Sequence, residues 1–184
     1  MWVITLIGPH GAGKTTIGTL LGARLGVPVN DEIGRRLAED PSWRPGGVLP
    51  SDGQDHFDSA VFEAELERDH RSQSPRVVET WHPGNLAYAS RRSPVATRRF
   101  IPAARSSVRR ARSAVVVLGA SREVLARRQS EPGSLDFFID VAVGAERWAR
   151  RLGIPVLARL RTDRSSPEAL AHQITSLTET WRNP

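Results

Sequence analysis

A glycine-rich segment near the start of the chain, GPHGAGKT at residues 8–15, combines residue types that suit an anion. It fits the pattern G-x-x-x-x-G-K-[ST] between an apolar run and a helical pattern, where such a loop turns its backbone N–H groups around a phosphate. Lys14 supplies a compact charge for the β- and γ-phosphates, and the Thr15 hydroxyl is a ligand for Mg²⁺. The segment therefore predicts nucleotide binding. The residues expected to hold the nucleotide here are Gly8, His10, Gly11, Ala12, Gly13, Lys14, Thr15 and Thr16.

The lysine of this loop is the only lysine in the chain, because the other 25 of the 26 basic side chains are arginines. A genome rich in G and C explains the general bias, and a phosphate-rich partner is the alternative explanation of the net charge of +6. Neither explains the exception at Lys14. A planar guanidinium is bulkier than an ammonium group and replaces it poorly inside a narrow loop. For His10, in the same loop, we expect only the backbone to matter.

The elements that must position this loop follow from the hydrophobic pattern. Short apolar runs alternate with longer amphipathic stretches, which is typical of βαβ units and a parallel sheet. Strands are expected at residues 2–7, 27–30, 76–80, 114–119 and 154–159. Helices are expected at 14–25, near 32–39, from Ser51 or Asp52 to about 71, and from 167 onward. No repeat or linker divides the chain, so residues 1–184 are expected to form a single domain.

Composition limits the class of protein. The absence of cysteine excludes a disulfide framework and a thiolate metal site. The apolar run at residues 2–7 is too short for a signal peptide, and no stretch approaches the ~20 apolar residues of a membrane span. We therefore expect a soluble, cytoplasmic protein that does not contact a membrane.

The motif set also narrows the type of nucleotide-binding protein. The guanine-reading element Asn-Lys-x-Asp of GTP-specific switch proteins is absent, since no lysine follows Lys14. A motor or remodelling ATPase is usually longer and carries a strand that ends in paired acids. With its phosphate loop, and with residues 25–32 (LGVPVNDE) followed by Arg35 and Arg36, the chain resembles the nucleoside and nucleotide kinase group of P-loop proteins. Thymidylate kinases, deoxynucleoside kinases and bacterial nicotinamide riboside kinases belong to that group, and the last are the most similar.

The resemblance implies an α/β, three-layer P-loop NTPase fold with a five-stranded parallel sheet in the order 2-3-1-4-5, flanked by helices. It also implies an acceptor held between the second and third strands, with Arg35 on that side, and a lid that bears arginines. Arg127 and Arg128 match the lid arginines that contact ATP phosphates, although residues 131–140 lack the further arginines typical of the group. The loop around Asp163 matches, weakly, the one that lies against adenine.

Three acids lie where strands of the expected sheet end, at the edge where ligands of such sheets bind. Glu79 is assigned to Mg²⁺, through water, or to the acceptor hydroxyl, and a capping or ion-pairing acid is the structural alternative. Asp31 and Glu32 are candidate general bases or sugar ligands, and ordinary acids of a first helical turn are the alternative.

Two further segments could define the acceptor. Trp81, His82, Asn85 and Tyr88 follow the third expected strand and suit a flat heterocycle or a sugar, although a packed loop explains them equally well. Residues 91–112 hold eight arginines. Three interpretations of this run stay open: a solvated helix face, a binding site for a phosphate of the acceptor, or a binding site for a polynucleotide.

The sequence as a whole predicts an ATP- and Mg²⁺-dependent phosphotransferase that acts on a small nucleoside, nucleotide or related metabolite by in-line transfer. A regulatory nucleotide-binding ATPase without a small acceptor, and a kinase of polynucleotide ends, stay open as alternatives. The acceptor, the choice between ATP and GTP, and the oligomeric state, a homodimer included, are not determined.

Overall fold

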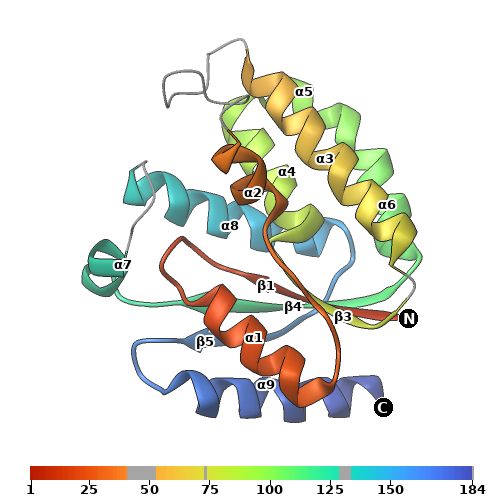
Figure 1. The fold of residues 1–184 in the computed structure, drawn as a ribbon. Coiled ribbons are helices and arrows are strands. Elements are labelled where there is room, and N and C mark those ends of the chain that lie inside the picture. The colour runs from red at the N-terminus through yellow and green to blue at the C-terminus, as the bar shows by residue number, and fades with distance from the viewer. Residues whose placement is uncertain (41–52, 73, 129–133, 184) are drawn as a thin grey trace.

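Five parallel strands form one sheet in the order β2-β3-β1-β4-β5, in a computed structural model that describes residues 1–40, 53–72, 74–128 and 134–183. The order confirms the α/β class and the topology expected from the sequence. Figure 1 shows the twisted sheet between two layers of helices. The strands are β1 (Trp2–Ile7), β2 (Val29–Asn30), β3 (Arg76–Glu79), β4 (Arg112–Gly119) and β5 (Val156–Arg161).

The central strand β1 sorts its side chains between the two layers. Ile4 and Leu6 pack in one cluster with residues of α1 (Lys14–Leu25) and α9 (Pro167–Arg182). Val3 and Ile7 pack in another with residues of α4 (Trp81–Arg92) and α8 (Leu135–Arg151). On the α4 side lie also α3 (Gly53–Arg71) and α6 (Ile101–Arg109) (Figure 1). The remaining helical elements are α2 (Ile33–Glu39), α5 (Pro94–Thr97), η3 (Arg98–Phe100) and α7 (Arg122–Arg128).

The structure shifts several predicted boundaries. The second strand is shorter than expected because the Val27 N–H donates to the Gly22 carbonyl and closes α1 as part of its glycine C-cap. β5 is partly exposed along its length rather than covered on both faces, because it is an edge strand. Helix α4 begins at Trp81, directly after β3, where a loop was expected. The predicted N-cap at Ser51 or Asp52 lies outside the described residues.

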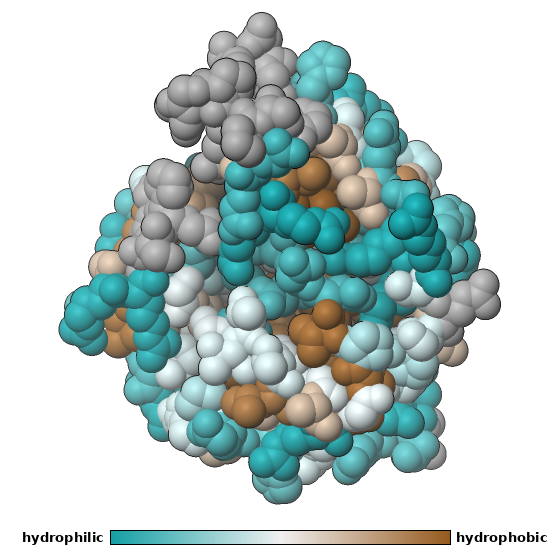
Figure 2. All heavy atoms as spheres, in the orientation of Figure 1, coloured by the Kyte–Doolittle hydropathy of each residue, from teal (hydrophilic) through white to brown (hydrophobic). Residues whose placement is uncertain are grey.

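The surface in Figure 2 is largely hydrophilic around α2, and hydrophobic residues reach it in small groups near α1. Within the ranges that the structure describes, no helix is both long enough and apolar enough to cross a bilayer.

A buried carboxylate joins four elements on the α4 side of the sheet. Asp69 of α3 accepts hydrogen bonds from Arg76 of β3 (2.5 Å), from Trp81 Nε1 (3.1 Å) and His82 Nε2 (2.8 Å) of α4, and from the hydroxyl of Ser107 on α6. Burial raises the pKa of Asp69, but hydrogen bonds from His82 and Ser107 and nearby positive charge outweigh it and lower the pKa to about 2. The ionised carboxylate is therefore a structural junction.

Replacing this junction should be costly, because Asp69→Ala leaves a buried guanidinium without its partner. We expect a loss of about 3–5 kcal/mol in the free energy of unfolding, measured by urea denaturation at pH 7. Asp140→Ala is the control, since Asp140 pairs with Arg91 at the surface (2.9 Å) and its loss should cost less than ~1 kcal/mol. Equal losses in the two variants would contradict the assignment.

The same pKa gives a pH dependence. An acid with a lowered folded-state pKa stabilises the protein fully above its unfolded pKa and loses that contribution as pH falls. The wild type should therefore lose the contribution of Asp69 as pH falls from about 4 toward about 2, and the Asp69→Ala variant should lack this component of its acid unfolding curve.

Candidate functional site

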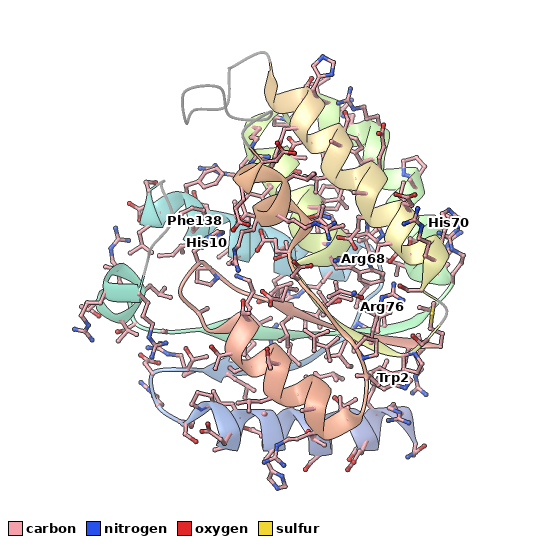
Figure 3. All side chains as sticks on the ribbon, viewed as in Figure 1. Trp2, His10, Arg68, His70, Arg76 and Phe138 are labelled. Atoms are coloured by element: carbon pink, nitrogen blue, oxygen red, sulfur yellow. The ribbon has the colours of Figure 1, made fainter. Side chains whose placement is uncertain are left out.

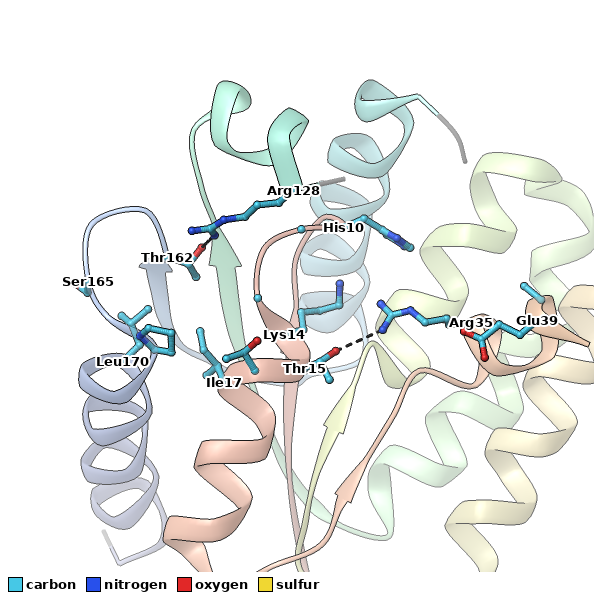
Figure 4. A pocket seen from close by; sticks show the side chains of 15 residues that line it. His10, Lys14, Thr15, Ile17, Arg35, Glu39, Arg128, Thr162, Ser165 and Leu170 are labelled. Atoms are coloured by element: carbon cyan, nitrogen blue, oxygen red, sulfur yellow. Dashed lines mark hydrogen bonds between the residues drawn. The ribbon is translucent and has the colours of Figure 1, made fainter. Parts of the chain in front are cut away.

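The glycine-rich loop lies between β1 and α1 and borders a pocket of about 830 Å³ at the carboxyl edge of the sheet (Figure 4). The residues that line the pocket are His10, Gly11, Gly13, Lys14, Thr15, Thr16, Ile17, Arg35, Ala38, Glu39, Arg128, Thr162, Ser165, Pro167 and Leu170. The structure thus brings most of the predicted loop residues to one cavity. The sequence offered no signal for Ile17, Ala38, Glu39 or Leu170 as its walls, whereas Thr162, Ser165 and Pro167 belong to the loop around Asp163 that the resemblance singled out.

Two glycines allow the loop its path. A Cβ atom at Gly8 would lie 2.3 Å from the Leu118 carbonyl oxygen of β4, a distance that no side chain tolerates. Gly13 precedes α1 with a φ of +81°, a left-handed conformation that favours glycine. Close approach to β4 and the sharp entry into the helix therefore explain why glycine stands at both ends of the loop.

The lone lysine is held inside the loop. Lys14 is only 5% exposed, and its Nζ donates to the carbonyl oxygens of Gly8 (3.1 Å) and Pro9 (3.3 Å). The ammonium group is therefore fixed next to the first turn of α1, where backbone N–H groups and the helix dipole favour an anion.

A hydrogen bond joins this turn to the neighbouring strand. The Thr15 hydroxyl donates to Oε2 of Glu79 at 3.0 Å, and Glu79 is 1% exposed at the end of β3. Burial is the main cause that raises the pKa of Glu79, and the charge of Glu32 acts in the same direction. The hydrogen bond from Thr15 and the charges of Lys14 and Arg35 oppose this shift. Glu79 is thus a buried carboxylate surrounded by the groups that a bound phosphate would meet.

The structure distinguishes the two acids that follow β2. Glu32 is 5% exposed and lies 3.8 Å from the guanidinium of Arg35, which also donates to the Thr15 hydroxyl at 3.4 Å. The Asp31 side chain is 63% exposed, and the backbone carbonyl of Asp31 accepts from Arg68. Of the two candidate bases, the structure brings Glu32 to the charged cluster and leaves Asp31 at the surface.

The donor ligands here suit a magnesium ion that shares its coordination with a phosphate. Mg²⁺ in phosphate-handling sites is held by one or two protein oxygens, by water and by the phosphates themselves. Thr15 and Glu79 supply one hydroxyl and one carboxylate at adjoining positions. In the described part of the chain, no group of three or more His, Asp or Glu side chains could hold a metal ion by itself. The residues therefore fit a shared ion and not an all-protein metal site.

On the opposite side of the pocket, Arg128 ends α7 and donates to the Thr162 hydroxyl at 3.2 Å (Figure 4). Arg127 is exposed and does not line the pocket, so of the predicted pair only Arg128 reaches it. The Asp163 carboxylate accepts from Arg161 (2.7 Å) and from the Ser121 N–H (2.8 Å), and these contacts hold its pKa well below the usual range. Asp163 thus ties two loops together beside the pocket. Part of the expected lid, residues 131–133, lies outside the described residues.

The predicted acceptor residues divide into two groups. Trp81 and His82 are at most 1% exposed and donate to Asp69, while Asn85 is 5% exposed and donates to Glu65 at 3.2 Å. Because α4 begins at Trp81, these side chains turn inward against α3 instead of reaching the pocket. Tyr88, one turn further on, contacts His10 of the loop instead.

An unusual backbone conformation produces this arrangement. Thr80 and Trp81 have positive φ angles of 69° and 46°, which non-glycine residues rarely adopt and which cost of order 1–3 kcal/mol each. The turn lets the chain pass from β3 into α4 without an intervening loop. Composition and spacing carry no signal for it, so sequence reasoning missed it.

The arginine-rich segment 91–112 mostly contacts its own chain. Arg92 pairs with Asp58, Arg99 donates to the Asp55 carbonyl (3.0 Å), and Arg112 donates to carbonyls at the end of α9. Arg91 pairs with Asp140 and Arg110 donates to the Ser106 hydroxyl, so five of the eight arginines have such partners among the described residues. These contacts favour a structural role over a phosphate grip.

Comparisons with known proteins agree with the fold. A family model described as an AAA domain matches residues 3–158. Among solved structures, deoxyadenosine kinase from M. mycoides, with the products dCMP and a flexible dCDP bound, has a TM-score of 0.67 at 12% identity, over 97% of this chain and 98% of that chain. The YorR protein from Bacillus subtilis, in complex with phosphorylated GDP, has a TM-score of 0.64 at 17% identity. The match covers 99% of this chain and 98% of that chain.

Shikimate kinase from Aquifex aeolicus has a TM-score of 0.58 at 18% identity, and 99% of each chain is covered. Identities this low show a common fold and do not by themselves transfer a reaction. No curated protein matches the sequence.

The raised pKa of Glu79 predicts that this carboxylate destabilises the free protein. Its ionisation costs free energy in the folded state, so stability falls as pH rises from the unfolded pKa through the folded one. We expect Glu79→Gln to unfold at a higher urea concentration than the wild type at pH 7, and the difference to shrink at pH 4. Glu63→Gln, at an exposed position of α3, is the control and should unfold at the same urea concentration as the wild type at both pH 7 and pH 4. A less stable Glu79→Gln protein at pH 7 would contradict this prediction.

Proposed function

We propose that this chain, which belongs to the AAA domain family, is an ATP- and Mg²⁺-dependent phosphotransferase that acts on a small nucleoside, nucleotide or related metabolite. The observation that carries the proposal is the hydrogen bond between the buried Glu79 and Thr15, which lines one pocket together with Lys14. The named activities of the solved neighbours, kinases of deoxyadenosine and shikimate, support the same reaction class.

Phosphoryl transfer needs positioning and charge neutralisation more than covalent chemistry. In the proposed mechanism, the loop N–H groups and Lys14 hold the β- and γ-phosphates of ATP at the first turn of α1. Thr15 and Glu79 would hold Mg²⁺, which supplies neutralisation of phosphate charge when bound. Arg35 and Arg128 flank the pocket and offset charge that shifts toward the leaving phosphate oxygen. Asp163 keeps the loop around the proposed adenine site in place.

The acceptor hydroxyl needs a group that receives its proton. We assign this role to Glu32, since its carboxylate is buried beside Arg35, whereas Asp31 is exposed. The acceptor oxygen forms a bond to the γ-phosphorus as the bond to the β,γ-bridging oxygen breaks, and the proton passes to Glu32. The pocket wall at Ala38 and Glu39, and Tyr88 next to His10 of the loop, stay candidates for acceptor contact.

The alternatives have weaker support. A kinase of polynucleotide ends needs free arginines along a groove, and the partners of Arg91, Arg92, Arg99 and Arg112 argue against that use. A regulatory ATPase would need the same phosphate loop, so only an assay separates it from a kinase.

The direct test incubates the protein with γ-labelled ATP, Mg²⁺ and a panel of nucleosides, nucleoside monophosphates and shikimate. We expect one class of acceptor to be labelled, and Lys14→Ala to reduce turnover by at least about 10²-fold through loss of electrostatic stabilisation. Thr19→Ala is the matched control, because Thr19 is exposed on the same helix and its hydroxyl donates to the Thr15 carbonyl. Slow hydrolysis of ATP with no labelled acceptor would reject the kinase in favour of the ATPase.

The assignment of the base is tested on the acceptor that the panel identifies. Glu32→Gln should lower kcat by about 10²–10⁴-fold while the affinity for Mg²⁺·ATP changes little, since a general base acts on the acceptor. Asp31→Asn, one residue away, should keep kcat within about twofold because its side chain lies outside the cluster. Equal effects of the two substitutions would overturn the choice of Glu32.

A further inference from the structure

The side chain of His10 is held by contacts with two helices, although the sequence predicted a role for the backbone of this residue alone. His10 is 6% exposed, and its Nε2 lies 2.7 Å from the hydroxyl of Tyr88 on α4. Its ring stacks on Phe138 of α8 with 4.0 Å between the ring centres and an angle of 26° between the planes. Figure 3 shows His10 and Phe138 side by side at the carboxyl edge of the sheet.

The partners of His10 are themselves fixed. The guanidinium of Arg92 lies 5.5 Å from the ring centre of Tyr88 and pairs with Asp58 on α3. Phe137, next to Phe138, approaches Tyr88 from α8 with 6.0 Å between ring centres. The histidine therefore connects the phosphate loop to two helices that are packed against each other, on the face of the sheet opposite α1.

We propose that His10, Tyr88 and Phe138 are positioning residues, which hold the phosphate loop in the shape that binds nucleotide. The inference rests on the proposed function, since it takes the loop to bind a nucleoside triphosphate. It adds that the affinity depends on a side-chain contact outside the phosphate-binding motif.

The physical reason is pre-organisation. A loop with three glycines among residues 8–13 has many accessible backbone conformations, and its apparent affinity falls in proportion to the fraction of molecules in the competent one. One hydrogen bond and one stacked ring pair restrict the loop at its midpoint, while the close approach of Gly8 to β4 and the start of α1 after Gly13 restrict its ends. Loss of one such hydrogen bond corresponds to a roughly two- to tenfold change in the competent fraction.

The experiment compares Tyr88→Phe with Ser90→Ala, and titrates each with the non-hydrolysable analogue AMP-PNP and Mg²⁺ by calorimetry. Both substitutions remove one hydrogen bond of α4, since Ser90 accepts from Trp148 Nε1 of α8 at 3.1 Å, but only Tyr88 reaches the loop. We expect Tyr88→Phe to weaken binding roughly two- to tenfold and Ser90→Ala to leave it unchanged. The melting temperature without nucleotide reports any loss of general stability separately.

A second variant tests the pairing. His10→Phe keeps an aromatic ring for Phe138 but cannot bond Tyr88, so the double variant His10→Phe, Tyr88→Phe should bind no more weakly than His10→Phe alone. Additive losses, or equal affinity of Tyr88→Phe and wild type, would overturn the positioning role.

The Lys14→Ala variant separates this result from the proposed function. If the wild type binds AMP-PNP and Lys14→Ala does not, while Tyr88→Phe binds normally, the nucleotide site stands and the positioning role falls. If the wild type itself binds no nucleotide, both proposals fail.

Discussion

The hydrogen bond between Thr15 and Glu79 is the interaction on which the arrangement of the site depends, and it follows from how parallel strands end. Leu6 of β1 is in register with Glu79 of β3, and the Thr80 N–H donates to the Leu6 carbonyl. Both strands therefore end at the same edge of the sheet. The chain passes from β1 through the loop into α1, and Glu79 is the last residue of β3. The crossover topology brings the N-terminus of α1 close enough to the Glu79 carboxylate for a hydrogen bond between Thr15 and Glu79. A helix N-terminus beside a carboxylate suits a phosphate with its divalent ion.

The buried carboxylate has a cost that the neighbouring residues offset. Burial raises the pKa of Glu79, and the backbone bends into a strained conformation at Thr80 and Trp81 directly after it. The next two side chains, Trp81 and His82, donate to Asp69, whose lowered pKa keeps it ionised as an acceptor. We infer that the hydrogen bonds to Asp69 hold the strained turn at Thr80 and Trp81 in place. The free energy that these bonds contribute offsets the cost of the buried Glu79 carboxylate.

The sequence predicted those features that depend on periodicity or on a motif. Alternating apolar runs gave the five strands, and the loop pattern placed Lys14 and Thr15, because each is a local property of the chain. The roles of Trp81, His82 and Asn85 depend instead on where α4 begins. The start of α4 follows from the positive φ angles of Thr80 and Trp81, which their residue types do not predict. The choice between Asp31 and Glu32 likewise depends on which of the two side chains is buried, and two adjacent acids in a sequence do not reveal that.

The contact of His10 extends this reasoning to the loop itself. The phosphate-binding motif fixes the ends of the loop through glycine and through α1, but it leaves the middle free. Tyr88 and Phe138 reach that middle from helices on the far side of the sheet from α1. The loop is therefore held from both helical layers. A substitution that moves Tyr88 or Phe138 away from His10 would alter the loop without touching its glycines or Lys14, and variation at positions 10, 88 and 138 should then be correlated among chains that share this loop.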